Sequence, residues 1–429
     1  MKQILRNIFL ILILSISPVL TLCASTPQAA VDSFVRIRAV DSTRIAVMVC
    51  DLRSGETLGE YNSDLPLVPA SIQKAVTIAS LLDRAGKDWR YNTKVYLEGN
   101  VIGDSVLDGN LLVVGSGDPT LNSSKLPLTS DFVADITSAL RRRGIDSIAG
   151  NIVVDKAVFQ GPPVPASWAS GDLPHAYGTG VHGFNFQNNA SGKSSVSDPS
   201  GVFAGKLATA LSAAGIRVGR HRMDAGGKKS LILNHKSAPM EDIMRSCMMR
   251  SDNLYAEALL RTLPLTVGKV STLEKAIGME QDYWKDADAD MEGVVIADGS
   301  GLSRSNRVTA LFMTDVLRLK SRDPWYASFF PLAGREGTLR NFLTGTPLEE
   351  YVALKTGSMS GIQCYAGYKL DDDYIPTHSV VVIVNGMRGS RAEVRRGVER
   401  MLLSIFLNLD GYKNRNEQIR DFAETLLRT

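Results

Sequence analysis

Three short patterns, each present once, place serine and lysine side chains where a serine could attack a carbonyl group. They are S-x-x-K at Ser71 and Lys74, S-D-N from Ser251 to Asn253, and K-T-G from Lys355 to Gly357. A serine hydroxyl is a poor nucleophile until a base within hydrogen-bond reach takes its proton. Residues i and i+3 of a helix share one face, so Lys74 would stand beside Ser71 as that base. The patterns predict a serine acyl-transfer site.

The electrostatics of such a site depend on a lysine with a lowered pKa and on backbone N–H groups. Burial of Lys74 and the nearby charge of Lys355 would both lower the pKa of Lys74. Ser71 opens its predicted helix, so its N–H is free to donate to a developing oxyanion. Ser358, just past the K-T-G pattern on an edge strand along the cleft, would supply a second N–H.

The other motif residues suit roles in proton transfer and substrate binding. We expect Ser251 to relay a proton to the leaving amine, and Asn253 to orient Lys74 and the substrate backbone. Lys355 and Thr356 would hold a carboxylate of the substrate.

Each pattern alone also has an ordinary structural explanation. Ser71 could cap a helix after Pro69 and Ala70, the S-D-N pattern could form another cap, and the K-T-G pattern could end a strand. All three patterns in this order, each on the element it needs, favour catalysis over three unrelated structural roles.

Other patterns in the chain do not indicate a cofactor, a metal or a nucleic acid. The segment Gly178–Gly183 matches G-x-G-x-x-G, but no helix opening follows it, so we expect no dinucleotide site. The five histidines are scattered, without an H-E-x-x-H motif or a cysteine pair at metal spacing. The basic run Arg141–Arg143 lies at a predicted helix end, where cations offset the helix dipole.

The elements that position these residues follow from hydrophobic spacing and turn residues. The sequence predicts strands at 44–52, 57–61, 351–356, 363–370 and 379–385, and helices at 71–85, 131–143, 203–214, 240–263, 308–319 and 391–407. Between about 88 and 239 the texture changes to short strands rich in Gly and Asn. We therefore expect one sheet-and-helix domain from residues 25–87 and 240–429, with residues 88–239 inserted as an accessory domain.

Length and composition agree with a globular protein of two or three domains. The chain has 429 residues, of which 44% are hydrophobic and 22% charged. Lys and Arg number 48 against 45 Asp and Glu, which gives a net charge of +3 and no signature of nucleic-acid binding. Four cysteines are too few for a disulfide scaffold, and we expect Cys50, Cys247 and Cys364 to be buried thiols.

The N-terminus has the pattern of a signal peptide over residues 1–24. Lys2 and Arg6 precede an apolar run over residues 8–16, and small residues near Ala24 offer a cleavage site. An uncleaved membrane anchor and lipidation at Cys23 remain alternatives. In each case we expect the mature protein to act outside the cytoplasm, in the periplasm or its equivalent.

The motif residues resemble those of the D-alanyl-D-alanine carboxypeptidase/endopeptidases, the class C low-molecular-mass penicillin-binding proteins. The resemblance covers roughly residues 30–408 and implies the penicillin-binding transpeptidase fold. This is an α+β fold, with an antiparallel sheet flanked by helices and a cleft facing an all-helical lobe. Only Asn185–Pro199 stands where longer members carry a β-rich segment, so we expect the innermost inserted subdomain to be missing. Besides the three patterns, the matching segments are Gly115–Leu121, Trp168 to Gly178, Asp298–Arg304 and Gly337–Leu339.

The resemblance also implies residues that bind the substrate. In the insert these are Asp172 and Tyr177; in the catalytic domain they are Arg304, Met359 and Ser360. A carboxylate can hold an ammonium group and a guanidinium can hold a carboxylate, so the Asp–Arg pair suits the zwitterionic end of meso-diaminopimelate in a stem peptide. The alternative is that Asp172 caps a turn and Arg304 pairs with a surface acid.

The function that this resemblance implies is a serine-type D-Ala-D-Ala carboxypeptidase or endopeptidase. It would act on peptidoglycan stem peptides through an acyl-enzyme on Ser71, without a cofactor, and β-lactams would inhibit it. A class A β-lactamase would need a Glu-x-x-x-Asn stretch between the second and third patterns, and none of the glutamates tested there has Asn four residues on. A non-catalytic penicillin-binding or wall-binding protein is the other alternative. Membrane association stays open, although the helix predicted at 391–407 suits core packing better than anchoring.

Overall fold

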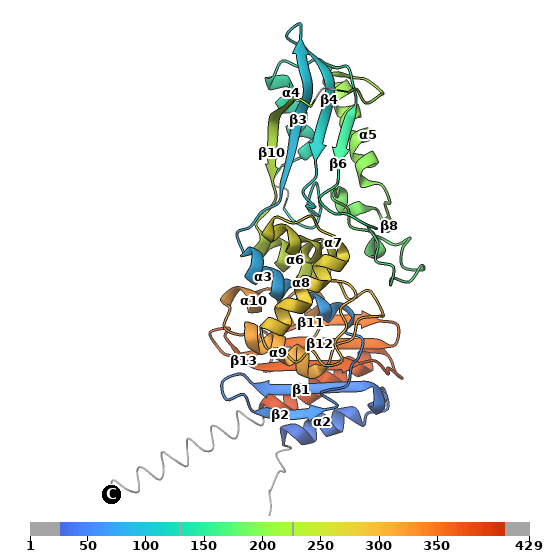
Figure 1. Ribbon diagram of the computed structural model, residues 1–429. Helices are drawn as coiled ribbons and strands as arrows, with labels where there is room; N and C mark the ends of the chain where they lie inside the picture. Colours follow the sequence, from blue (N-terminus) through green and yellow to red (C-terminus); the bar gives the residue numbers. More distant parts are fainter. Residues whose placement is uncertain (1–25, 128–129, 225–226, 408–429) are drawn as a thin grey trace, which may run out of the picture.

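The computed structural model describes residues 26–127, 130–224 and 227–407 and shows an elongated molecule (Figure 1). One sheet lies at each end of the long axis, and a layer of helices lies between them. The predicted signal peptide and its alternatives lie outside the described residues.

A five-stranded antiparallel sheet joins the two ends of the chain. Its order is β11-β12-β13-β1-β2, so β11 is an edge strand, as predicted. Strands β1 and β2 pair antiparallel, and a turn after Asp371 links β12 to β13. The strands are β1 (Ile45–Asp51), β2 (Thr57–Tyr61), β11 (Val352–Met359), β12 (Ile362–Leu370) and β13 (Pro376–Val384).

This sheet is buried on both faces, because alternate residues of a strand point to opposite sides. In β1, Ala46 and Met48 join one hydrophobic core and Val47 and Val49 join the other. Helix α2 (Pro27–Val35) and the helix over residues 391–407 cover one face. Helices α3 (Gln73–Ala85), α6 (Met240–Arg250), α7 (Asn253–Thr262), α8 (Leu273–Asp286), α9 (Ala310–Lys320) and α10 (Pro324–Ser328) form the layer on the other side. This arrangement confirms the predicted α+β class.

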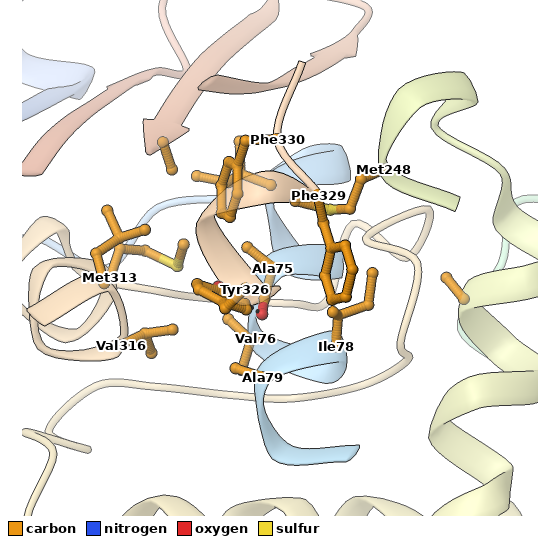
Figure 2. Close-up of a cluster of buried hydrophobic side chains, with 14 of the residues drawn as sticks. Ala75, Val76, Ile78, Ala79, Met248, Met313, Val316, Tyr326, Phe329 and Phe330 are labelled. Carbon is orange, nitrogen blue, oxygen red and sulfur yellow. Dashed lines mark hydrogen bonds between the residues drawn. The ribbon is translucent and has the colours of Figure 1, made fainter. Parts of the chain in front are cut away.

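Helix α3 runs through the larger core and carries the first motif at its start. Residues 73–82 of α3 are buried without a break. Figure 2 shows Tyr326, Phe329 and Phe330 packed around the α3 residues Ala75 and Ile78. The Tyr326 hydroxyl also donates a hydrogen bond to the Ala75 carbonyl over 2.9 Å. Packing on all sides therefore fixes the helix that must hold Lys74.

The insert forms a second sheet of six strands with its own core. Its order is β10-β3-β4-β5-β9, with β6 paired to β4. Helices α4 (Phe132–Arg142) and α5 (Pro199–Ala213) supply aromatic and aliphatic residues to this core. The strands are β3 (Asn92–Ile102), β4 (Val106–Val114), β5 (Ser147–Ile148), β6 (Ile152–Asp155), β9 (Arg217–Val218) and β10 (Lys229–Lys236); a small hairpin, β7 (Ala190–Ser191) with β8 (Ser194–Ser195), precedes α5. The strands of this second sheet all lie within residues 88–239; the division into a catalytic domain and an accessory domain stays a prediction.

Several predicted element boundaries were wrong, three of them with a consequence for the site or a clear physical cause. The helix expected over 240–263 is broken at Ser251, which has left-handed backbone angles (φ 56°, ψ 45°) and ends α6. Asp252 then caps α7, a signal hidden in the otherwise helical spacing. Helix α5 begins at Pro199 rather than at residue 203, because Asp198 caps it. Strand β11 continues to Met359, past the predicted end at 356.

Two further findings concern the cysteines and membrane spans. Cys50, Cys247 and Cys364 are free and buried, which confirms the expected thiols. Within the described part of the chain, no helix combines the length and the apolar character that a membrane crossing requires.

Candidate active site

Ser71 lies on a tight turn at the start of α3. A 3-10 turn, η2 (Ala70–Ile72), leads directly into the helix, so the serine stands at its N-terminus. Ala70 has a positive φ of 47°, an unusual conformation for a residue with a Cβ. Gly301 packs against this turn so closely that a Cβ there would lie 1.8 Å from the Ala70 carbonyl oxygen. Gly301 therefore packs directly against the backbone that precedes the serine.

Lys74 is buried, and its Nζ makes three hydrogen bonds, one of them to Ser71. Its Nζ lies 2.9 Å from Ser71 Oγ, 2.7 Å from Asn253 Oδ1 and 2.6 Å from the Ser300 carbonyl oxygen. Burial lowers the pKa of Lys74 below its ordinary value, against the opposing charges of nearby acids such as Asp298. This is the environment in which a lysine can become a neutral base.

The S-D-N pattern forms the turn between α6 and α7. Because Ser251 adopts the left-handed conformation, the chain reverses there and Asn253 opens α7. The Asn253 amide bridges two parts of the molecule: Oδ1 accepts from Lys74, and Nδ2 donates to the Tyr177 carbonyl in the insert over 2.8 Å.

The K-T-G strand adds a second serine–lysine pair. Lys355 Nζ donates to Ser251 Oγ over 2.9 Å and to the Thr356 carbonyl over 2.7 Å. Burial, and then the charge of Lys74, hold the pKa of Lys355 well below its ordinary value. The Thr356 hydroxyl shares a 2.8 Å hydrogen bond with Thr338, within one of the segments that carry the family resemblance.

Gly357 allows the edge strand β11 to approach the nucleophile. A Cβ at this position would lie 3.0 Å from the Ser71 nitrogen and 2.7 Å from the Pro69 carbonyl oxygen. The glycine therefore brings β11 next to the serine turn, closer than any other residue type would allow.

Ser71, Ser251 and Thr356, one residue from each of the three patterns, line one cleft of about 530 Å³. A larger cavity of about 1050 Å³ lies elsewhere, beside α10 and the β12–β13 turn. No residue of the three patterns lines this larger cavity along the described ranges. The chemistry therefore assigns the smaller cleft as the candidate active site. Its lining residues are Ser71, Ser251, Thr338, Leu339, Phe342, Thr356, Ser358, Gln363, Tyr365, Arg391, Ala392 and Arg395.

Comparison with known proteins decides the family. The family described as D-Ala-D-Ala carboxypeptidase 3 (S13) matches the chain over residues 27–194 and 187–425. The chain belongs to the S13 family. It is a serine-type D-Ala-D-Ala carboxypeptidase, a hydrolase, which confirms the function inferred from the sequence.

Individual relatives agree with this assignment. The chain is 24% identical over 424 residues to a D-alanyl-D-alanine carboxypeptidase of Actinomadura, covering 79% of this chain and 77% of that protein. It is 24% identical over 409 residues to D-alanyl-D-alanine carboxypeptidase DacB of Haemophilus influenzae, covering 76% and 82%. The crystal structure of penicillin-binding protein 4 from Haemophilus influenzae superposes with a TM-score of 0.73 at 19% identity, covering 90% of this chain and 98% of that one. The penicillin-binding protein fold is thereby confirmed.

The predicted substrate-binding residues of this S13 carboxypeptidase fall into two separate groups. In the insert, the Tyr177 hydroxyl donates to Asp172 Oδ1 over 2.9 Å. On the catalytic side, Arg304 donates to the Ser360 carbonyl over 3.2 Å, and the Met359 carbonyl accepts from Arg391. No ion pair joins Asp172 to Arg304 within the described residues. Their predicted roles in binding the substrate stay a prediction.

Several residues of the site were missed at the sequence level. Glu257 of α7 accepts from the Gly299 and Ser300 N–H groups through Oε1, and so fixes the loop whose carbonyl binds Lys74. Burial raises the pKa of Glu257 to about 8. Its position four residues after Asn253, on the same helix face, is the signal that would have found it.

Two other missed contributions come from distant parts of the chain. Trp168 of the insert donates its indole N–H to Asp298, whose carboxylate also accepts from Gly301 and Ser303 N–H groups. Lys125 of the insert forms an ion pair with Asp252 inside the S-D-N pattern. Nothing in the spacing of a single sequence indicates these long-range pairs.

Proposed function

We propose that the protein hydrolyses the D-Ala-D-Ala bond of peptidoglycan stem peptides through an acyl-enzyme on Ser71. The observation that carries the proposal is the set of three hydrogen bonds made by buried Lys74. A neutral amine has two N–H groups and one lone pair. When Asn253 Oδ1 and the Ser300 carbonyl accept the two N–H groups, the lone pair is left directed at Ser71, ready to take its proton.

Acylation would then develop negative charge on the carbonyl oxygen of the substrate, which two backbone N–H groups stabilise. The first is that of Ser71 at the helix start. The second is that of Ser358, by the two-residue period of β11. The Leu354 N–H bonds outward to Pro331. The Ser358 N–H, four residues on, therefore faces the same open side of the edge strand.

The leaving D-alanine amine requires a proton, and Ser251 is the group placed to give it. Its hydroxyl passes a proton to the amine and takes one from Lys355, to which it is hydrogen bonded. In deacylation a water molecule replaces the amine and the transfers run in reverse. The water gives a proton to the Ser251 hydroxyl, which passes its own proton to Lys355. Ser71 Oγ takes back its proton from Lys74.

The charges around the cleft suit a substrate that ends in a carboxylate. We assign Thr356, next to Lys355, to the terminal carboxylate, and the cleft also presents Arg391 and Arg395 from the helix over residues 391–407. We further assign Asp172, Tyr177, Arg304, Met359 and Ser360 to the side chain of meso-diaminopimelate. The side chains of Tyr177 and Arg304 are exposed and available to a ligand.

We also propose that residues 1–24 are a signal peptide that brings the enzyme to the peptidoglycan outside the cytoplasm. β-Lactams would acylate Ser71 and remain bound. A structure of the Haemophilus influenzae protein carries a β-lactam, at a TM-score of 0.65 and 20% identity to this chain; that likeness concerns the fold.

Mass spectrometry of purified muropeptides, before and after incubation with the protein, tests this proposal. We expect loss of terminal D-alanine, or cleavage of cross-linked dimers, and we expect penicillin to block both. Loss of D-alanine identifies carboxypeptidase action and loss of dimers identifies endopeptidase action. Unchanged muropeptides with enzyme that still binds penicillin would instead favour a non-catalytic binding protein.

A further inference from the structure

The S-D-N turn is held by the insert through a largely buried ion pair. Asp252 is 8% exposed, and its two carboxylate oxygens have different partners. Oδ1 caps α7 by accepting from the Tyr255 N–H over 2.9 Å. Oδ2 pairs with the ammonium group of Lys125, which belongs to the segment between β4 and α4. Removing a capping carboxylate or its partner would loosen the turn that carries Ser251 and Asn253.

The backbone of Lys125 is fixed by two contacts that do not involve its side chain. Its N–H donates to Ser123 Oγ over 3.1 Å, and its carbonyl accepts from Ser246 of α6 over 3.2 Å. Its ammonium group also lies 5.6 Å from the centre of the Tyr255 ring. Because the backbone contacts are independent of the side chain, a neutral substitution at residue 125 would leave this segment in place.

A second contact clamps the same turn from another part of the insert. The Tyr177 carbonyl accepts from Asn253 Nδ2, while Asn253 Oδ1 accepts from Lys74. The turn is thus held by two contacts with the insert: the ion pair of Asp252 with Lys125, and the hydrogen bond from Asn253 to the Tyr177 carbonyl. Both clamps come from the insert.

The charge of Asp252 also faces Lys74. The titratable and charged groups around Lys74 are Cys247 of α6, Asp252, Glu257 of α7, Asp298 and Lys355 of β11. Near neutral pH the Cys247 thiol is uncharged, because burial raises its pKa to about 12, and Glu257, with a pKa of about 8, is mostly protonated. Asp298 is surrounded by hydrogen-bond donors. Among the residues that the structure describes, the ion pair of Asp252 is the one with Lys125.

We propose that Lys125 is a positioning residue through which the insert takes part in acylation: it holds Asp252, keeps Ser251 and Asn253 in register with Lys74, and offsets a charge that would otherwise keep Lys74 protonated. This rests on the proposed roles of Ser71 and Lys74 and goes beyond substrate selection. It concerns every acyl donor, including penicillin, which offers no zwitterionic side chain to Asp172.

The test is the rate of acylation by a fluorescent penicillin, measured against pH for four proteins. They are the wild type, Lys125→Met, Lys125→Arg, and Lys193→Met as a control at an exposed lysine of the same insert. At pH 7 we expect Lys125→Met to lose about tenfold, a coupling typical of residues in one salt-bridge network. The rising limb of its pH–rate profile should move to higher pH, because an Asp252 without its cation favours the protonated form of Lys74. Lys125→Arg should restore both, and Lys193→Met should match the wild type.

A wild-type rate and a wild-type pH profile in Lys125→Met would overturn the proposal. A loss of rate that comes without a shift of the pH profile, or that Lys125→Arg does not restore, would also overturn it. If Lys125→Met fails to fold in thermal unfolding, Lys125→Met/Asp252→Asn replaces it. Asn keeps the cap acceptor and removes the charge, so its limb should lie at the wild-type pH; a limb at higher pH would refute the charge argument. Ser71→Ala, run in parallel, separates the two proposals: labelling of that variant would refute the acyl-enzyme itself.

Discussion

At the scale of single residues, the environment of Lys74 decides whether this site can acylate. A solvated lysine is protonated at neutral pH and cannot accept the proton of Ser71. Full burial lowers the pKa of Lys74, and the hydrogen bonds that its amine donates to Asn253 Oδ1 and the Ser300 carbonyl orient it. Sequence reasoning predicted the pair Ser71 and Lys74 from spacing alone, since the i, i+3 rule is local. It could not provide Ser300, because that contact joins residues 226 positions apart.

Replacement of Lys74 tests the base directly. Lys74→Arg keeps a positive charge but cannot provide a neutral amine near neutral pH, so penicillin acylation should fall by roughly a hundredfold or more. In the wild type the rate should rise with pH as Lys74 loses its proton, with a midpoint below the ordinary lysine value of 10.5. Stopped-flow labelling across pH measures both. Wild-type labelling by a folded Lys74→Arg protein would show that another group is the base.

Asp172 and Arg304 test substrate selection at the same scale. Asp172→Ala and Arg304→Ala should each slow cleavage of diaminopimelate-ended peptides by roughly ten- to hundredfold, while penicillin acylation stays near the wild-type rate. Penicillin offers no such zwitterionic side chain, so it serves as the internal control. Equal losses toward peptide and penicillin would indicate that these residues support the fold instead.

At the scale of elements, the site depends on how closely β11 approaches the turn that carries Ser71. The sequence predicted β11 as an edge strand, and the sheet order agrees. It did not predict the break between α6 and α7, because the hydrophobic spacing of the two helices runs on through Ser251. A left-handed serine stabilised by tertiary contacts leaves no local signal.

The close approach can be tested at Gly357. Gly357→Ala would bring a Cβ to 2.7 Å from the Pro69 carbonyl oxygen and 3.0 Å from the Ser71 nitrogen, so β11 must move outward. We expect a loss of roughly tenfold or more in penicillin acylation, from a misplaced oxyanion site. Gly205→Ala in α5 is the matched control: its Cβ meets nothing within 4 Å, and it should stabilise the fold by about 0.5–1 kcal/mol without changing acylation. Wild-type acylation by Gly357→Ala would show that the approach is not needed.

At the scale of the whole molecule, the insert and the catalytic part meet at the S-D-N turn. The insertion was predicted from a change of texture along the chain, and the structure forms a second sheet from strands in that region (Figure 1). The contacts across the junction, such as Trp168 with Asp298, could not be predicted: both residues lie in segments that carry the family resemblance, but nothing in the sequence pairs two residues 130 positions apart. The fold was therefore more predictable than the connections that hold its parts together.

Global stability should carry the signature of a buried acid in the helical layer. Glu280 of α8 accepts from Ser80 of α3 through Oε1, and burial raises the pKa of Glu280 to about 8. A raised pKa means that the native state holds a proton that the unfolded chain releases above about pH 4.5. This contribution is complete below pH 4.5 and is lost as the pH rises to about 8. Chemical unfolding at a series of pH values measures it. Glu280→Gln should gain roughly 1–3 kcal/mol on the wild type at pH 9, relative to pH 5. An identical pH dependence in the two proteins would contradict the burial argument.

The acyl-enzyme on Ser71 is the central claim, and peptide mapping of the penicillin-labelled protein tests it most directly. The wild type should carry one penicilloyl group on the peptide that contains Ser71, and Ser71→Ala should carry none while turnover falls by several orders of magnitude. A penicilloyl group on a different residue of the wild type, or undiminished labelling of a folded Ser71→Ala protein, would contradict the account.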